Sequence, residues 1–136
     1  MSSHLYLPVF FDTNIPLYLL SSDSAKAQRA EDLLETGGSI SVQVLNEFVA
    51  AARRKQAAPW PRIAETLATL KLVCKVEPLT LDTHEKAVLL AQRYGIPIYD
   101  ATIAASALLA GCATLYSEDF QHGQVIEGMT ICNPFV

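Results

Sequence analysis

A chain of 136 residues, 51% of them hydrophobic and 18% charged, is large and apolar enough to bury one core, which excludes an intrinsically disordered protein and predicts a single domain over residues 1–136. The three cysteines, Cys74, Cys112 and Cys132, contain no Cys-x-x-Cys pair, which excludes a zinc ribbon and predicts buried free thiols in a reducing cytoplasm. The net charge of −4, taken alone, argues against a nucleic-acid partner.

Two apolar stretches have the composition of a membrane segment but not its pattern. Residues 5–20 include Asp12, and no Lys or Arg precedes them, so they lack the basic region of a signal peptide. Residues 96–116 are interrupted by Pro97 and carry Asp100, whose charge would be costly in lipid. We therefore expect both stretches in the core of a cytoplasmic protein that does not enter the membrane.

The first half of the chain alternates strand and helix patterns. Val9-Phe10-Phe11 predicts a short buried strand that ends at Asp12, and Pro16 fits the first turn of a helix capped by Thr13 or Asn14. The next predicted elements, in order, are a helix over 24–36 ended by Gly37-Gly38, a strand over 39–42 and a helix over 44–55.

The second half continues the alternation. Ile63, Leu67, Leu70 and Cys74 predict a helix, and a strand is expected within residues 74–79. Asp82 and Glu85 resemble a capping box at the start of a helix that stops at Gly95. The next predicted element is an Ala-rich helix that has Asp100 as its N-cap or in its first turn and ends at Gly111. After it come a strand over 113–116, a polar loop over 117–123 and a strand over 129–132. This order predicts an α/β fold with a central, mostly parallel sheet flanked by helices.

Four acids stand at corresponding places in these units. Asp12 and Asp119 follow the ends of strands, whereas Glu47 and Asp100 are expected in the first turns of helices. In an open α/β sheet, ligands bind beyond the carboxyl ends of the strands, so all four acids are expected on one patch. Each acid alone has an ordinary alternative. Asp12 could be a turn residue and Asp119 a loop acid, whereas Glu47 could be a helix-dipole contact and Asp100 a plain N-cap.

Such a cluster of like charges would raise the pKa of each member unless a cation bound there. Mg²⁺ takes oxygen ligands, and two such ions can activate water and stabilise the leaving oxygen in phosphodiester hydrolysis. Bound cations would also cancel the four charges that account for the net charge of −4.

The basic residues Arg53, Arg54 and Lys55, with Arg62 close behind, are either a solvated helix face or a contact to RNA. His122, beside Gly123, is expected to be structural or to contact RNA, because two-metal hydrolysis needs no histidine proton donor.

The segments FFDTNIPLYLL, SVQVLNEF, IPIYDATIAASALLAGCATLYSEDFQHG and ICNPF resemble the PIN domain, specifically VapC-type toxins of bacterial toxin–antitoxin pairs. The resemblance implies an endoribonuclease that depends on Mg²⁺ (or Mn²⁺), acts on RNA such as tRNA, and is inhibited by an antitoxin protein; we also expect a homodimer. It further implies that Asp12 and Asp100 are the primary metal ligands, that Glu47 and Asp119 complete the site, and that Thr13, Asn14 and Ser117 support it. Glu118, which adjoins Asp119, stays an alternative fourth acid.

Three alternatives compete with this hypothesis. A haloacid-dehalogenase-type phosphatase would need an acid where Asn14 stands, and a response-regulator receiver would need one where Phe11 stands. The rival from another class is a non-catalytic PIN-like binding or regulatory module. Such degenerate domains usually lose an acid, and this chain has all four.

Overall fold

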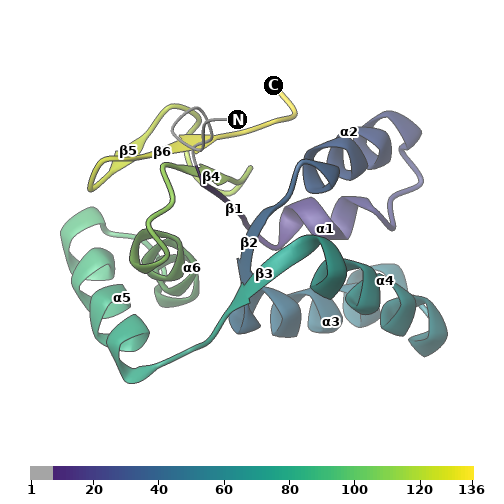
Figure 1. The fold of residues 1–136 in the computed structure, drawn as a ribbon, viewed down its shortest axis with the longest axis horizontal. Coiled ribbons are helices and arrows are strands. Elements are labelled where there is room, and N and C mark those ends of the chain that lie inside the picture. Colours follow the sequence, from purple (N-terminus) through teal and green to yellow (C-terminus); the bar gives the residue numbers. More distant parts are fainter. Residues whose placement is uncertain (1–7) are drawn as a thin grey trace, which may run out of the picture.

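The computed structural model describes residues 8–136, and its centre is a six-stranded sheet in the order β3-β2-β1-β4-β6-β5 (Figure 1). All neighbouring strands pair in parallel except β5 and β6, which form an antiparallel hairpin. The strands are β1 (Val9–Phe11), β2 (Gly38–Ser41), β3 (Cys74–Glu77), β4 (Thr114–Tyr116), β5 (Val125–Ile126) and β6 (Met129–Cys132).

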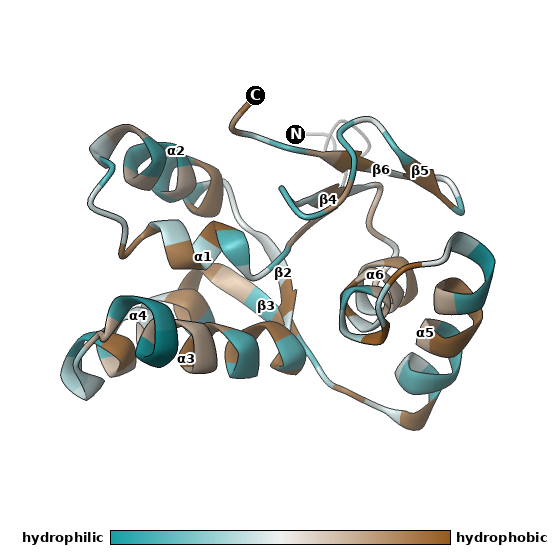
Figure 2. Ribbon diagram, turned by 180° about the vertical axis from the view of Figure 1, so that it is seen from behind, coloured by the Kyte–Doolittle hydropathy of each residue, from teal (hydrophilic) through white to brown (hydrophobic). Residues whose placement is uncertain are grey.

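Within residues 8–136, six helices flank this sheet, which confirms the predicted α/β class with a mostly parallel sheet. They are α1 (Asn14–Tyr18), α2 (Ser24–Glu35), α3 (Val42–Gln56), α4 (Trp60–Val73), α5 (Leu81–Tyr94) and α6 (Ile98–Leu109). Figures 1 and 2, seen from opposite sides, place α1 to α4 on one side of β1–β3 and the neighbouring helices α5 and α6 on the other. The Ala-rich α6 is mostly hydrophobic in Figure 2, and its central residues, from Ile103 to Ala107, are all buried.

The core explains the apolar strands. Phe10, Ile40 and Leu115, from the three central strands, are completely buried. Gly38 has no room for a side chain, because an added Cβ would lie 2.6 Å from the Phe11 ring and 3.0 Å from the Val9 carbonyl oxygen. This close approach lets β2 pack beside β1, and Gly37, at φ +85°, supplies the turn that precedes it.

Two helix starts differ from the sequence-based prediction. Helix α3 begins at Val42, because extended Ser41 is its N-cap and accepts the Val44 N–H with its hydroxyl oxygen. Glu47 therefore lies in the second turn, and the expectation of a first-turn position was wrong. Helix α5 is capped by Thr80, which exchanges hydrogen bonds with Thr83, so the capping box predicted at Asp82 and Glu85 was also wrong.

The apolar stretches and the cysteines lie close to where they were expected. Residues 5–7 lie outside the described residues, and the rest of the stretch 5–20 forms β1, α1 and the turn after α1. No helix between residues 8 and 136 is long and apolar enough to span a bilayer. All three cysteines are free; Cys74 and Cys112 are buried, whereas Cys132 is only partly buried, which corrects the expectation of three buried thiols.

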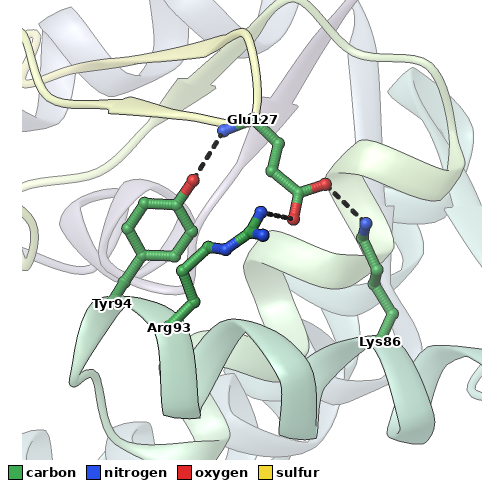
Figure 3. A network of polar contacts seen from close by, with 4 residues as sticks. All are labelled: Lys86, Arg93, Tyr94 and Glu127. Atoms are coloured by element: carbon green, nitrogen blue, oxygen red, sulfur yellow. Dashed lines mark hydrogen bonds and ion pairs between the residues drawn. The ribbon is translucent and has the colours of Figure 1, made fainter.

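The hairpin β5–β6 was only half predicted, because β5 has two residues and offers no alternating pattern. Its turn places Glu127 at φ +46° and Gly128 at φ +86°, the left-handed pair of a type I′ turn. Figure 3 shows how this turn is attached to α5. The Glu127 carboxylate pairs with Lys86 and Arg93, and the backbone N–H of Glu127 donates to the Tyr94 hydroxyl at 3.2 Å. The hairpin is thereby fixed at the end of the sheet remote from α1–α4.

Candidate functional site

Asp12 is the most buried acid of the chain's predicted site, with 1% of its surface exposed. It directly follows β1, and its backbone N–H still bonds to the carbonyl of Tyr116 at the end of β4. Its Oδ1 accepts the Thr13 N–H at 2.7 Å, and its Oδ2 accepts the Ser117 hydroxyl at 2.7 Å. Burial raises the pKa of Asp12 from 3.8 to about 7, with further increases from Asp119 and Asp100 that these hydrogen bonds only partly offset.

Asp100 lies in the first turn of α6, where Pro97 rather than Asp100 is the N-cap residue. Its pKa is raised by partial burial first, and then by the negative charges of Asp119 and Glu47. Since Asp119 also raises the pKa of Asp12, the four predicted acids share one electrostatic environment at the carboxyl edge of the sheet. The structure thus brings together all four, from four separate parts of the chain.

Glu47 is held by two neighbours on its own side of the site. Its Oε1 accepts the Thr13 hydroxyl at 2.9 Å, and its Oε2 accepts the Gln43 amide at 2.8 Å. Thr13 therefore links two of the acids, because its N–H bonds to Asp12 and its hydroxyl bonds to Glu47. Gln43, one turn before Glu47 on α3, was not identified from the sequence, where the spacing i, i+4 was its only signal.

Glu118 and Asp119 both line the cleft beside the acids, but they have different partners. The Glu118 carboxylate accepts the Tyr18 hydroxyl at 2.7 Å, and its N–H donates to Asn14 Oδ1 at 3.4 Å. Tyr18 has a raised pKa through burial and this carboxylate. Asp119, by contrast, interacts electrostatically with Asp12 and Asp100, and its N–H donates to the Ser117 hydroxyl at 3.0 Å.

This difference gives a matched pair of substitutions. We expect Glu118→Gln to leave RNA cleavage within about twofold of wild type, because an amide oxygen still accepts the Tyr18 hydroxyl. Asp119→Asn should lower cleavage at least about tenfold, the effect of losing more than about 1.4 kcal/mol of transition-state stabilisation. Initial cleavage rates of the two purified variants decide the matter. The assignment is wrong if Glu118→Gln is the more damaging change.

A cleft of about 500 Å³ opens beside these acids. Glu47, Asp119, Thr13 and Asn14 line one part, and Arg54 and Lys55 from the last turn of α3 line another. Tyr99, which precedes Asp100 and is 66% exposed, lies on the same cleft and was not identified from the sequence. The cleft therefore presents both signs of charge and an exposed aromatic ring.

The other two candidate RNA contacts have partners within the protein. Arg53 donates to the carbonyl of Ala58 at 2.9 Å and lies over the Trp60 ring, 4.9 Å from its centroid. His122 accepts the Asn133 N–H on Nδ1 at 2.9 Å, so it joins the loop after β4 to the end of β6. Neither residue lines the cleft, whereas Arg54 and Lys55 do.

The donor set fits a hard cation in its chemistry. It consists of carboxylate oxygens with hydroxyl and amide groups around them, which suits Mg²⁺ or Mn²⁺ and not zinc. Within residues 8–136, no three His, Cys, Asp or Glu side chains lie close enough together to enclose an ion.

The chain belongs to the PIN domain family, whose sequence model matches residues 9–126. Its fold is that of VapC toxins. It is similar to a toxin–antitoxin complex from Klebsiella pneumoniae (25% identity, TM-score 0.71, covering 93% of this chain and 97% of that one). It is also similar to Mycobacterium tuberculosis VapC20, a toxin that cleaves the sarcin–ricin loop (26% identity, TM-score 0.66, covering 80% of this chain and 88% of that one).

A third similar structure is VapBC2 from Rickettsia felis bound to a promoter DNA fragment (17% identity, TM-score 0.66, covering 92% of this chain and 97% of that one), which supports the fold alone. No curated protein sequence matches the chain.

Proposed function

We propose that this PIN domain is a divalent-metal-dependent endoribonuclease and acts as the toxin of a VapC-type toxin–antitoxin pair. The observation that carries the proposal is the convergence of Asp12, Glu47, Asp100 and Asp119 beside one cleft, at a mutual range where their charges raise the pKa values of Asp12 and Asp100. A cluster with perturbed pKa values in a cleft is the usual mark of a functional site.

Each residue has a definite part in the proposed reaction. Asp12 and Asp100 would hold Mg²⁺ (or Mn²⁺), with Glu47 and Asp119 binding directly or through water. The bound ion would lower the pKa of water and stabilise negative charge on the phosphate. Thr13 and Ser117 hold both oxygens of Asp12 in place, so the carboxylate need not reorganise when substrate arrives. Arg54 and Lys55 would bind phosphates of the RNA, which includes tRNA among the candidate substrates.

The proposal is tested by metal dependence. We expect cleavage of single-stranded RNA with Mg²⁺ or Mn²⁺, complete loss in EDTA, and recovery on adding metal back. Products should carry 5′-phosphate and 3′-hydroxyl ends, as the resemblance to the family implies, with the attacking water displacing the 3′-oxygen. The melting temperature should also rise with Mg²⁺, because the ion binds only the folded state. Cleavage that persists in EDTA, or 2′,3′-cyclic phosphate ends, would contradict the metal mechanism; Mg²⁺ binding without cleavage would favour a non-catalytic PIN module.

The partners are part of the proposal as well. The Klebsiella pneumoniae relative is a toxin–antitoxin complex, so we propose an antitoxin protein as the cytoplasmic inhibitor.

We also propose a homodimer, because large apolar side chains remain exposed on α5 and α6, among them Leu81, Leu89 and Leu109. Light scattering should give twice the chain mass at tens of micromolar, roughly the range at which a weak interface forms. A monomer at that concentration would refute the dimer.

A further inference from the structure

We propose that Tyr99 is a base-stacking residue of the cleft and that Arg54 and Lys55 bind the phosphates next to the one that is cut. The inference rests on the proposed nuclease function and adds how an unpaired strand lies in the site. Its starting observation is the exposure of Tyr99: 66% of the residue's surface is accessible, although the next residue, Asp100, belongs to the carboxylate cluster.

The charges of the cleft run in one direction along α3. Glu47, Arg54 and Lys55 stand at spacings of seven and eight residues, so they share one face of the helix. All three line the cleft. Seven residues of helix separate the carboxylate from the first cation by roughly 10 Å. A strand with its scissile phosphate at the acids therefore reaches Arg54 and Lys55 with a neighbouring phosphate.

Both cations are available to a ligand. Neither Arg54 nor Lys55 forms an ion pair with any residue from 8 to 136, in contrast to Lys86 and Arg93 on α5. Asn14, which also lines the cleft, is 8% exposed and keeps its amide Nδ2 without an acceptor among those residues. A hydrogen-bond donor left unpaired beside two free cations favours an oxygen-rich, anionic ligand.

An exposed aromatic ring beside free cations is the arrangement that binds single-stranded nucleic acid. Bases stack on the ring without regard to sequence, and the cations follow the backbone. In a duplex the bases are already stacked on each other and offer no free face to Tyr99. The cleft should therefore prefer unpaired RNA to paired RNA of the same sequence.

The experiment measures RNA binding by fluorescence anisotropy, with Mg²⁺ present, in an Asp12→Asn background. This substitution is expected to stop cleavage, and it alters none of the residues that line the cleft, because Asp12 is buried. The probes are a fluorescein-labelled 12-nucleotide single strand and its duplex. Tyr99→Ala should weaken single-strand binding at least about fivefold, the lower end of measured stacking energies. Tyr99→Phe, which keeps the ring, should bind like the parent, and the duplex should bind more weakly than the strand.

The cations are tested by salt dependence. Replacing both Arg54 and Lys55 with alanine should reduce the slope of log K against log salt by about 1.4, since each phosphate contact on a single strand contributes about 0.7. Lys71→Ala, which removes an exposed basic residue of α4 outside this cleft, is the matched control and should leave the slope unchanged.

The possible failures are distinct. If the wild-type protein cleaves RNA but Tyr99→Ala binds RNA as tightly as its parent, the inference is wrong and the proposed function stands. Wild-type protein that neither binds nor cleaves RNA would overturn both the inference and the proposed function.

Discussion

Asp12→Asn is expected to abolish RNA cleavage and, at the same time, to stabilise the metal-free protein. The carboxylate is buried, and its pKa in the folded protein is about 7 against an ordinary 3.8. At pH 8 the folded state must keep a charge that burial disfavours, at a cost on the order of 4 kcal/mol at most, from about 1.4 kcal/mol per pKa unit. Asparagine removes the charge, and its oxygen can still accept the Thr13 N–H.

The sign of the pH dependence is fixed by these values. A carboxyl group whose folded pKa is raised favours the folded state when protonated, so wild-type stability should fall as the pH rises from about 4 to about 7 and then level off. Asp12→Asn should lack this decline. Urea unfolding of both proteins in EDTA at pH 5 and pH 8 measures the difference. If the variant were less stable than wild type at pH 8, the raised pKa of Asp12 would be wrong.

Asp100→Asn should also abolish cleavage, with a change in metal-free stability of less than about 1 kcal/mol. The residue lies in the first turn of α6, so losing its charge removes a helix-dipole contribution of about 0.3–1 kcal/mol. Against this loss, repulsion from Asp119 and Glu47 is relieved. Because Asp100 is only half-buried, solvent screens that repulsion, and the two effects should nearly cancel.

Thermal melts in EDTA and in Mg²⁺, beside a cleavage assay, test the Asp100 prediction. The Mg²⁺-dependent rise in melting temperature should shrink in the variant, because one anionic ligand is lost. Asp82→Asn, in the first turn of α5, is the matched control, since it removes a similar dipole contact away from the site. Wild-type cleavage by Asp100→Asn would mean that Asp100 only stabilises its helix.

Much of this site could be predicted because it follows local patterns. Asp12 was identifiable from the apolar strand before it, and Asp100 from its place before an Ala-rich helix. Glu47 was placed one turn too early because the predicted strand ran to Val42, a residue that favours strands, whereas the Ser41 hydroxyl starts the helix at Val42. At α5, Thr80 and Thr83 capped the helix in place of the acids at Asp82 and Glu85.

The contacts that could not be predicted join residues far apart in the chain. The bond between Tyr18 and Glu118 spans 100 residues, and no periodic pattern in either segment indicates it. The exposure of Tyr99 likewise depends on the shape of the cleft, which α1, α3 and the loop after β4 form together. Such features follow from tertiary packing, which local patterns do not encode.

The hydrogen bond from Ser117 to Asp12 has a consequence for synthesis on the ribosome. Its two residues are 105 positions apart, and at about 5–20 residues per second the second is made roughly 5–20 seconds after the first. Strand β1 meanwhile lacks β4, its neighbour on one side, because β4 directly precedes Ser117. Asp100 and Asp119 also emerge late, so a nascent chain holds an incomplete carboxylate cluster for most of translation. The proposed nuclease site therefore becomes complete only late in the synthesis of the chain.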